Sequence, residues 1–302
     1  MSIPSSLSTI LYAQKGTVSP SLTGVVRNAS GVATSNSNTN VSVISNDQEL
    51  KAKLLAKDLE DTIRDGVSAL ELISNNTTPM TNPPDVTLLN STIKSLHGIP
   101  LNADQPKRKL AEDVLSKYKI FQYIGYLTPS GNDYFSEPYS PFQTKLQPHN
   151  FAFREHYKGV IASREPYMSN VITNVPTGKL HAVVAIPIYS QNNNKLLIGI
   201  LIGGLNFTYF DQSFRSLNVT NSVQRIVLAD HNGTAIADSQ SSSNNHNYLS
   251  KESFVNLQSF KNAIASKSGS IIEPVNGTKM LVSYHPVHAI QRTWAILLMK
   301  PL

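Results

Sequence analysis

Two stretches of this chain repeat one order of elements, and this repetition constrains the fold more than any other feature. In each, an apolar strand pattern ends at a turn glycine, Gly131 or Gly233, and a helical pattern follows. Strands with a single proline come next, Pro187 and Pro286, which follow the turn glycines by 56 and 53 residues. Such spaced self-similarity indicates duplicated units. The sequence therefore predicts two tandem modules, the second smaller, with each proline at a strand edge or a bulge because proline lacks an N–H for the ladder.

The spacing of apolar residues and turn residues sets the remaining elements. A helix is expected over 151–162 in the first module and over about 251–265 in the second. The strands outside the two hairpins are expected over the following ranges: 179–189, 195–207, 269–273, 278–288 and 293–299. Together these elements predict an α+β fold in which each module is a mainly antiparallel sheet with flanking helices.

A long amphipathic helix precedes the repeats. Apolar residues recur at steps of three and four from Leu55 to Ile73, and Asn46 with Glu49 offers a capping box at the start. We expect a helix from Asp47 to the Asn75–Asn76 pair, roughly 40 Å long at about 1.5 Å per residue, which is long enough to span both modules. Gly66 inside this helix is expected to permit close packing rather than to break it.

These patterns divide the chain into four expected parts. The first is polar and rich in Ser, Thr and Asn, which is typical of a flexible linker. In order, the parts are a flexible segment over 1–46, the long helix over 47–80, a first module over 81–219 with short helices at 86–96 and 107–117, and a second module over 220–302.

Composition excludes several classes of protein. The chain has no cysteine, so disulfides, thiolate metal sites and cysteine nucleophiles are excluded. The net charge of +6 is spread along the chain without a dense basic run, so we expect no nucleic-acid partner. Nine Asn-x-Ser/Thr triplets favour an extracytoplasmic location. The longest apolar run, 196–207, is shorter than the ~20 residues that a membrane-spanning helix needs.

The sequence also lacks the common catalytic motifs. It contains no Gly-x-Ser-x-Gly elbow, no phosphate-binding Gly-Lys-Ser/Thr loop, no Gly-x-Gly-x-x-Gly and no His-Glu-x-x-His. The spacing of His149, His156 and His181 matches no metal-ligand signature. We therefore predict a protein that is not an enzyme and that holds neither a metal nor a cofactor.

Several short stretches, taken in their order and spacing, carry a family resemblance. They are 153–159, 167–169, 184–188 and 199–204 in the first module, and 227–233, 284–287 and 294–297 in the second. With the long helix, they make the chain from Asp47 to Leu302 resemble the double Cache sensor domain, a PAS-like extracytoplasmic module of chemoreceptors and sensor kinases. The resemblance implies a ligand-sensing domain that binds a small molecule in its first, membrane-distal module.

The same resemblance implies how the domain is used. We expect a homodimer through the long helix, and a membrane anchor in the full-length protein that this sequence does not include. The alternative is a secreted or surface-tethered protein that binds a small solute without signalling. An extracellular hydrolase of unknown type is a third, weaker hypothesis.

In the amino-acid-binding branch of the family, the motif is an upstream aromatic residue, Arg-x-Trp-Tyr, a later Tyr and an Asp on the last strand. Arg154, Tyr157 and Tyr167 match this motif, while His156 replaces the Trp and His149 takes the upstream aromatic place. The place of the Asp falls at a glycine, residue 204, so an acid to hold a ligand ammonium is missing there. We therefore expect an organic acid more than an amino acid.

Arg154 is the residue most expected to hold the ligand, because a guanidinium offers a planar pair of donors to a carboxylate. The alternative is a structural ion pair between Arg154 and Glu155, Asp133 or Asp211. The full predicted set of ligand-binding residues is Arg154, His156, Tyr157, Tyr167, Tyr123, His181 and Asn206.

Overall fold

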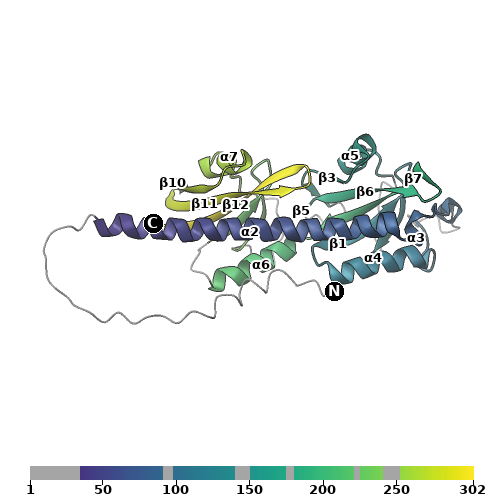
Figure 1. Ribbon diagram of the computed structural model, residues 1–302, viewed down its shortest axis with the longest axis horizontal. Coiled ribbons are helices and arrows are strands. Elements are labelled where there is room, and N and C mark those ends of the chain that lie inside the picture. The colour runs from purple at the N-terminus through teal and green to yellow at the C-terminus, as the bar shows by residue number, and fades with distance from the viewer. Residues whose placement is uncertain (1–34, 91–97, 140–149, 175–179, 221–224, 241–251) are drawn as a thin grey trace.

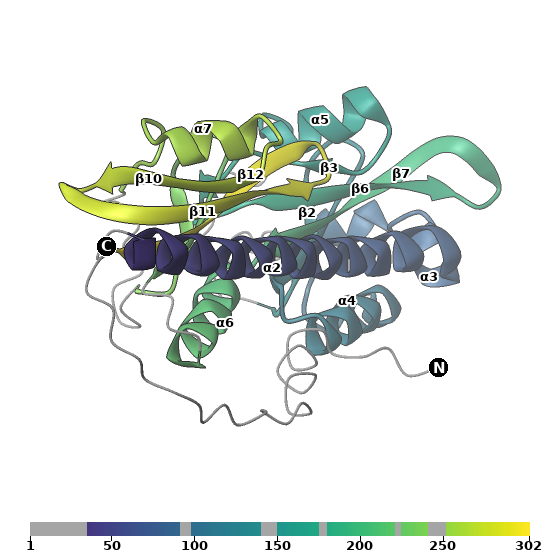
Figure 2. The same cartoon turned by 60° about the vertical axis from the view of Figure 1, so that its left-hand side comes forward.

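A computed structural model of the protein describes residues 35–90, 98–139, 150–174, 180–220, 225–240 and 252–302 (Figure 1). One helix, α2 (Ser35–Asn76), runs the length of the molecule, and two five-stranded sheets lie one after the other along it (Figures 1 and 2). The predicted α+β class is confirmed.

The long helix begins at Ser35, earlier than the expected Asp47, so the predicted flexible segment is wrong over residues 35–46. Ser, Thr and Asn have only moderately lower helix propensity than alanine, and adding residues to a helix that is already nucleated is far easier than starting one. The helix is thus roughly 60 Å long at about 1.5 Å per residue. Residues 1–34 lie outside the described part of the chain.

One face of α2 is apolar and packs against both sheets. Its buried residues include Ala52, Leu55, Leu59, Ile63, Val67, Leu70 and Ile73. At Gly66 the helix approaches the first sheet closely, because a Cβ there would lie 2.7 Å from Cδ1 of Ile120. This explains the glycine as a packing position, as the sequence predicts.

The first sheet has the antiparallel order β2-β1-β7-β6-β3. Its strands are β1 (Phe121–Leu127), β2 (Asp133–Glu137), β3 (Tyr167–Met168), β6 (Val183–Ser190) and β7 (Asn193–Leu205). The flanking elements are α3 (Thr78–Thr81), η1 (Val86–Asn90), α4 (Gln105–Lys117), α5 (Glu155–Ser163) and the small ladder of β4 (Ile172–Thr173) with β5 (Leu180–His181). The helix expected over 86–96 is a short 3₁₀ turn as far as Asn90, and residues 91–97 lie outside the described chain.

The second sheet has the order β10-β11-β12-β8-β9 and is also antiparallel. Its strands are β8 (Arg225–Ala229), β9 (Ala235–Asp238), β10 (Gly269–Val275), β11 (Thr278–Ala289) and β12 (Arg292–Pro301). Helix α6 (Phe207–Thr220) leads into this sheet and α7 (Gln258–Ile264) covers one of its faces. The expected domain boundary at 219/220 stays a prediction.

The two halves repeat in detail, which supports the predicted duplication. Gly131 and Gly233 both adopt the left-handed region, with φ of 84° and 81°. The carbonyl of Gly131 accepts the N–H of Phe151 at 2.7 Å, and that of Gly233 accepts the N–H of Phe254 at 2.8 Å. Each bond is followed by a turn, in which the N–H of Arg154 donates to the carbonyl of Phe151 and that of Leu257 donates to the carbonyl of Phe254. These turns explain why α5 and α7 begin several residues later than their patterns predict.

Both strand prolines lie where the outer neighbour of their strand has ended. Strand β3 pairs with β6 only at Val184 and Ala185, before Pro187. Strand β10 pairs with β11 no further than Tyr284, before Pro286. Neither proline therefore leaves a gap in a ladder on that side, and the prediction of edge positions is confirmed.

Candidate ligand-binding site

The face of the first sheet that α5 covers, here called the α5 face, carries a small apolar cluster of its own. The cluster consists of Leu127, Val160, Val183, Ala185, Ile200 and Ile202. Four of the partly buried residues packed against it are aromatic: Tyr123, Phe151, Tyr157 and Tyr167. This face lies on the other side of the sheet from α2, and six of the seven predicted site residues are on it or at its rim.

Arg154 is the N-cap residue of α5, with extended backbone and a half-buried side chain. Its guanidinium carbon lies 4.9 Å from the centre of the Phe153 ring. Within the described residues the guanidinium makes no hydrogen bond or ion pair, and the structural pairings with Glu155, Asp133 or Asp211 are not formed. The position therefore presents an uncompensated positive charge next to a partly apolar surface.

Two histidines on this face are buried, with 4% exposure each for His156 and His181. Burial lowers the pKa of His156 to about 3, and the nearby His181 and Arg154 act in the same direction. His156 is thus a neutral imidazole near pH 7, and neither of its ring nitrogens has a partner among the described residues. A neutral ring offers one donor and one acceptor to a bound molecule.

Tyr123 fills the place where the family motif has an acid. It pairs across the ladder with Gly204, and a Cβ on that glycine would lie 2.1 Å from Cε1 of the tyrosine ring. The hydroxyl of Tyr123 lies 3.3 Å from Nε2 of His181, with the rings edge to face. Burial raises the pKa of Tyr123, so its hydroxyl keeps its proton. Gly204 is therefore required by the ring above it.

The other two tyrosines use their hydroxyls within the protein. Tyr157 donates to the carbonyl of Pro129 at 2.7 Å. Tyr167 packs its ring on Gly159, where a Cβ would lie 2.4 Å from the ring, and donates to Oε1 of Glu155 at 3.0 Å. Burial and the bond to Glu155 raise the pKa of Tyr167. Both tyrosines thus act as apolar walls whose positions are held by hydrogen bonds.

Asn206 does not join this group. It follows β7, and its amide donates to the carbonyl of Lys119 at 3.3 Å. In the described part of the chain, no contact links it to the other predicted residues. Strand β7 ends at Leu205, so Asn206 does not continue the alternation that places Gly204 on the α5 face.

Asp133 is a further candidate residue, which the sequence analysis considered only as an ion-pair partner of Arg154. It opens β2 opposite Leu127, so it lies on the α5 face, and only 5% of it is exposed. Its charge also contributes to the raised pKa of Tyr123. The register of the β1–β2 hairpin is the signal that could have identified Asp133. Tyr123 and Leu127 lie on the same side of β1, and Asp133 is paired with Leu127, so it lies on that side too.

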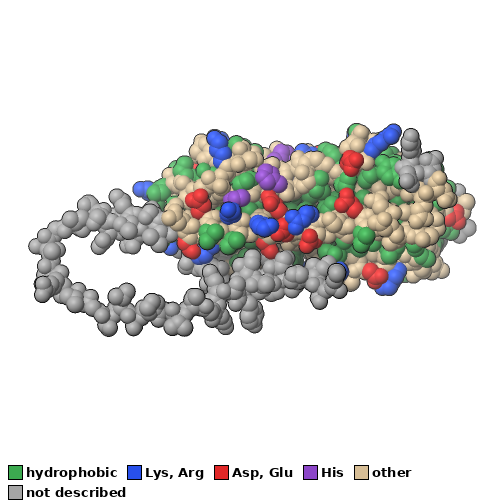
Figure 3. Space-filling view, viewed as in Figure 1, with side chains coloured by type: hydrophobic (Ala, Val, Ile, Leu, Met, Phe, Trp, Pro, Cys, Tyr) green, Lys and Arg blue, Asp and Glu red, His purple; other side chains and the backbone are tan. Residues whose placement is uncertain are grey.

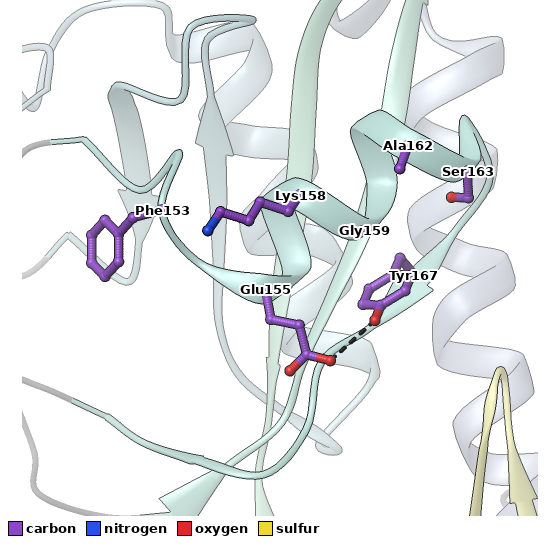
Figure 4. A pocket seen from close by; sticks show the side chains of 7 residues that line it. All are labelled: Phe153, Glu155, Lys158, Gly159, Ala162, Ser163 and Tyr167. Atoms are coloured by element: carbon purple, nitrogen blue, oxygen red, sulfur yellow. Dashed lines mark hydrogen bonds between the residues drawn. The ribbon is translucent and has the colours of Figure 1, made fainter.

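An open hollow of about 790 Å³ lies beside the start of α5 (Figure 4). Its lining consists of Phe153, Glu155, Lys158, Gly159, Ala162, Ser163 and Tyr167. Of the predicted site residues, Tyr167 lines it, and the two neighbours of Arg154 in sequence do so as well. Within the described residues no group of His, Asp and Glu could hold a metal ion, and His149 lies outside them.

A long helix followed by two sheets of matching strand order, with a polar and aromatic site on the first, defines a class of two-module sensor domain. The family model of the Cache domain, in its double form, matches residues 36–302. The chain therefore belongs to the double Cache family. Domains of this family are extracytoplasmic sensors that bind small ligands, rather than enzymes.

Solved structures share this fold at low identity. They include the ligand-binding domain of the Pseudomonas aeruginosa PAO1 amino acid chemoreceptor PctC in complex with GABA, with 14% identity, TM-score 0.58, and 85% of this chain and 100% of that chain covered. A domain of a sensory box/GGDEF family protein from Vibrio parahaemolyticus has 14% identity, TM-score 0.59 and coverage of 87% and 97%. The domain of the Pseudomonas fluorescens chemoreceptor CtaA with L-isoleucine has 13% identity, TM-score 0.56 and coverage of 88% and 96%.

Comparison with curated proteins gave no match. Within the described residues, no helix has both the length and the apolarity to span a membrane.

Proposed function

We propose that this chain is the sensing domain of a signal-transduction protein of the chemoreceptor or sensor-kinase type, and that it binds a small carboxylate at the α5 face. The observation that carries the proposal is the half-buried guanidinium of Arg154, which has no partner among the described residues. A guanidinium in a partly desolvated site binds a carboxylate through two charge-assisted bonds. The neutral ring of His156 would add one donor and one acceptor without adding charge.

An amino acid is a second candidate ligand, supported by the buried carboxyl of Asp133 on the same face. An ammonium group requires an acidic or carbonyl partner when it leaves water. Asp133 would supply it from β2, in place of the acid that Gly204 cannot provide. Similar folds have been solved with GABA and with L-isoleucine, both of which carry a carboxylate and an ammonium group.

Three ligands of similar length separate these candidates: butyrate, γ-aminobutyrate and butylamine. If the domain binds carboxylates, isothermal titration should detect the first two ligands but not the third. Arg154→Gln should weaken binding about 10- to 100-fold, since hydrogen bonds to charged groups are worth about 1.5–3 kcal/mol. If Asp133 holds the ammonium, Asp133→Asn weakens γ-aminobutyrate only. Lys109→Gln, which removes an exposed cation of α4 away from the α5 face, is the control. Unchanged affinity in Arg154→Gln would place the site elsewhere.

A homodimer through α2 remains part of the proposal. The solvent face of α2 carries three exposed leucines, Leu50, Leu54 and Leu72, with exposed fractions of 56%, 43% and 59%. Between them lie charged side chains of both signs, which Figure 3 shows gathered along the middle of the molecule. Alternating charges can pair across a two-fold axis. Sedimentation equilibrium should show a dimer that dissociates in the double variant Leu50→Glu/Leu54→Glu, and an unchanged mass would exclude this face.

A further inference from the structure

We propose that Glu155 and Arg292 form a latch that couples the α5 face to the β11–β12 hairpin of the second sheet and, through that hairpin, to the middle of α2. The signalling consequence rests on the proposed function, because Glu155 directly follows Arg154 at the start of α5. The coupling itself is a property of the described contacts and can be tested without a ligand.

The latch joins residues that are 137 positions apart in the chain. Arg292, the first residue of β12, donates through Nη2 to the carboxylate of Glu155 and to the hydroxyl of Tyr167, the latter at 3.1 Å. The hydroxyl of Tyr167 donates in turn to Glu155, as the dashed line in Figure 4 shows. The guanidinium carbon also lies 5.8 Å from the centre of the tyrosine ring. Three groups from α5, β3 and β12 thus hold one another.

The neighbouring residue makes a second connection to the same edge. Oε1 of Gln291 accepts the N–H of Met168 at 3.1 Å, and its Nε2 donates to the carbonyl of Pro166 at 2.5 Å. The Gln291 side chain thereby forms hydrogen bonds with the backbone N–H and C=O groups at the start of β3, as a neighbouring strand would. The hairpin tip is held closely, since Ile290 within it adopts φ of 56°, a conformation that β-branched residues rarely take.

The hairpin also contacts α2 directly. The backbone N–H of His288 donates to Oε1 of Glu60 at 2.6 Å. Glu60 lies near the middle of α2, on the turn before Ile63, which packs in the core between α2 and the sheets. Because a backbone amide makes this contact, a displacement of the hairpin must either move Glu60 or break the bond.

These contacts form a continuous path from the candidate site to the long helix. A ligand held by Arg154 would displace the first turn of α5. Glu155 lies in that turn, so its ion pair would transmit the displacement to Arg292. The side chains of Glu155 and Arg292 are 32% and 20% exposed, so water can compete for the pair and its opening and closing are both accessible. A contact of this kind suits a switch better than a permanent support.

Hydrogen–deuterium exchange on the ligand-free protein tests the coupling. Glu155→Gln should raise exchange at least about fivefold in the hairpin residues 288–293 and in residues 58–62 of α2, the lower bound for coupled sites. The reverse must also hold, so Glu60→Gln should raise exchange at the start of α5. The charge swap Glu155→Arg/Arg292→Glu should restore protection.

Lys109→Gln is the matched control, since it breaks an exposed ion pair with Asp113 inside α4. It should leave all three segments unchanged. Increased exchange confined to α5 in Glu155→Gln, with the hairpin and α2 unaffected, would overturn the latch. Because no ligand is used, this outcome is independent of the titrations at Arg154, and either proposal can fail while the other stands.

Discussion

The two sheets present corresponding faces under α5 and α7, and the residues at equivalent positions differ. Tyr123 pairs with Gly204 in the first sheet, and Arg225 pairs with Met299 in the second. The N-cap of α5 is Arg154, whereas that of α7 is an apolar leucine packed against its core cluster. The same backbone plan thus carries different side chains at equivalent positions of the two faces.

The second sheet also satisfies its own charge. Arg225 pairs with Asp238 and Glu252, and its guanidinium lies 5.6 Å from the centre of the Phe254 ring. Arg154 has no such pairs among the described residues. The difference indicates that Arg225, which pairs with acids, is a structural element, and that Arg154, which pairs with none in the described part of the chain, is a candidate receptor.

The largest effect on stability is expected when Gly204 of the first sheet is replaced by methionine, the residue at the equivalent position of the second sheet, Met299. Gly204→Met should lower the free energy of unfolding by about 3 kcal/mol, because its side chain must displace the Tyr123 ring. Adding Tyr123→Ala should recover part of this loss by making room. Urea unfolding measures both variants. If Gly204→Met has wild-type stability, then the ring does not require the glycine.

Arg225→Gln should cost about 2 kcal/mol of unfolding free energy, since it leaves two partly buried carboxylates without their cation. Thermal and urea unfolding give the value. Arg64→Gln, which removes an exposed ion pair with Asp61, is the control and should change stability by less than about 0.5 kcal/mol. An equal effect in both variants would show that Arg225 is not a structural element.

The histidine of the first face should make the protein acid-sensitive. The pKa of His156 is lowered to about 3 in the folded state, below its ordinary value near 6.5, so the unfolded chain binds the extra proton first. Stability is therefore full above the ordinary pKa and falls as pH decreases, by about 1.4 kcal/mol per pH unit between roughly pH 6 and 4.

His156→Asn should remove this slope, measured by urea unfolding across that pH range. The exposed His288→Asn is the control and should keep it. Asp58 works in the opposite direction, because burial raises its pKa to about 6 and favours the folded state on acidification. Only the difference in slope between the two histidine variants therefore tests the assignment.

The smallest effect on stability is expected at the candidate receptor itself. Arg154→Leu, which copies the N-cap residue of α7, should change the free energy of unfolding by less than about 0.5 kcal/mol because the guanidinium makes no ion pair with described residues. The same variant should lose carboxylate binding. A large loss of stability would instead identify Arg154 as a structural residue.

Much of this fold could be predicted because its signals are local. The periodicity of α2, the turn glycines and the strand prolines each depend on a few neighbouring residues, and all of them were located correctly. The start of α2 was not, because helix extension past Asn46 depends on a nucleus that lies further along the chain.

The site was predicted in part. Arg154, His156 and Tyr123 were named together from the family motif, and the structure places them on one face. Arg154 was expected inside a helix over 151–162, whereas it is the N-cap residue of α5. Asn206 lies apart from the other candidates, since the strand ends before it. Asp133 was considered only as an ion-pair partner, because its place depends on the register of a hairpin with a bulge.

The sequence by itself determined the duplicated plan, the long helix and the arginine at the start of α5, since each follows from local spacing and residue type. The tertiary structure alone decided that Tyr123 lies over Gly204 and that Arg292 reaches Glu155. Such contacts join distant segments, and their geometry is set by packing in the whole molecule, which no local pattern encodes.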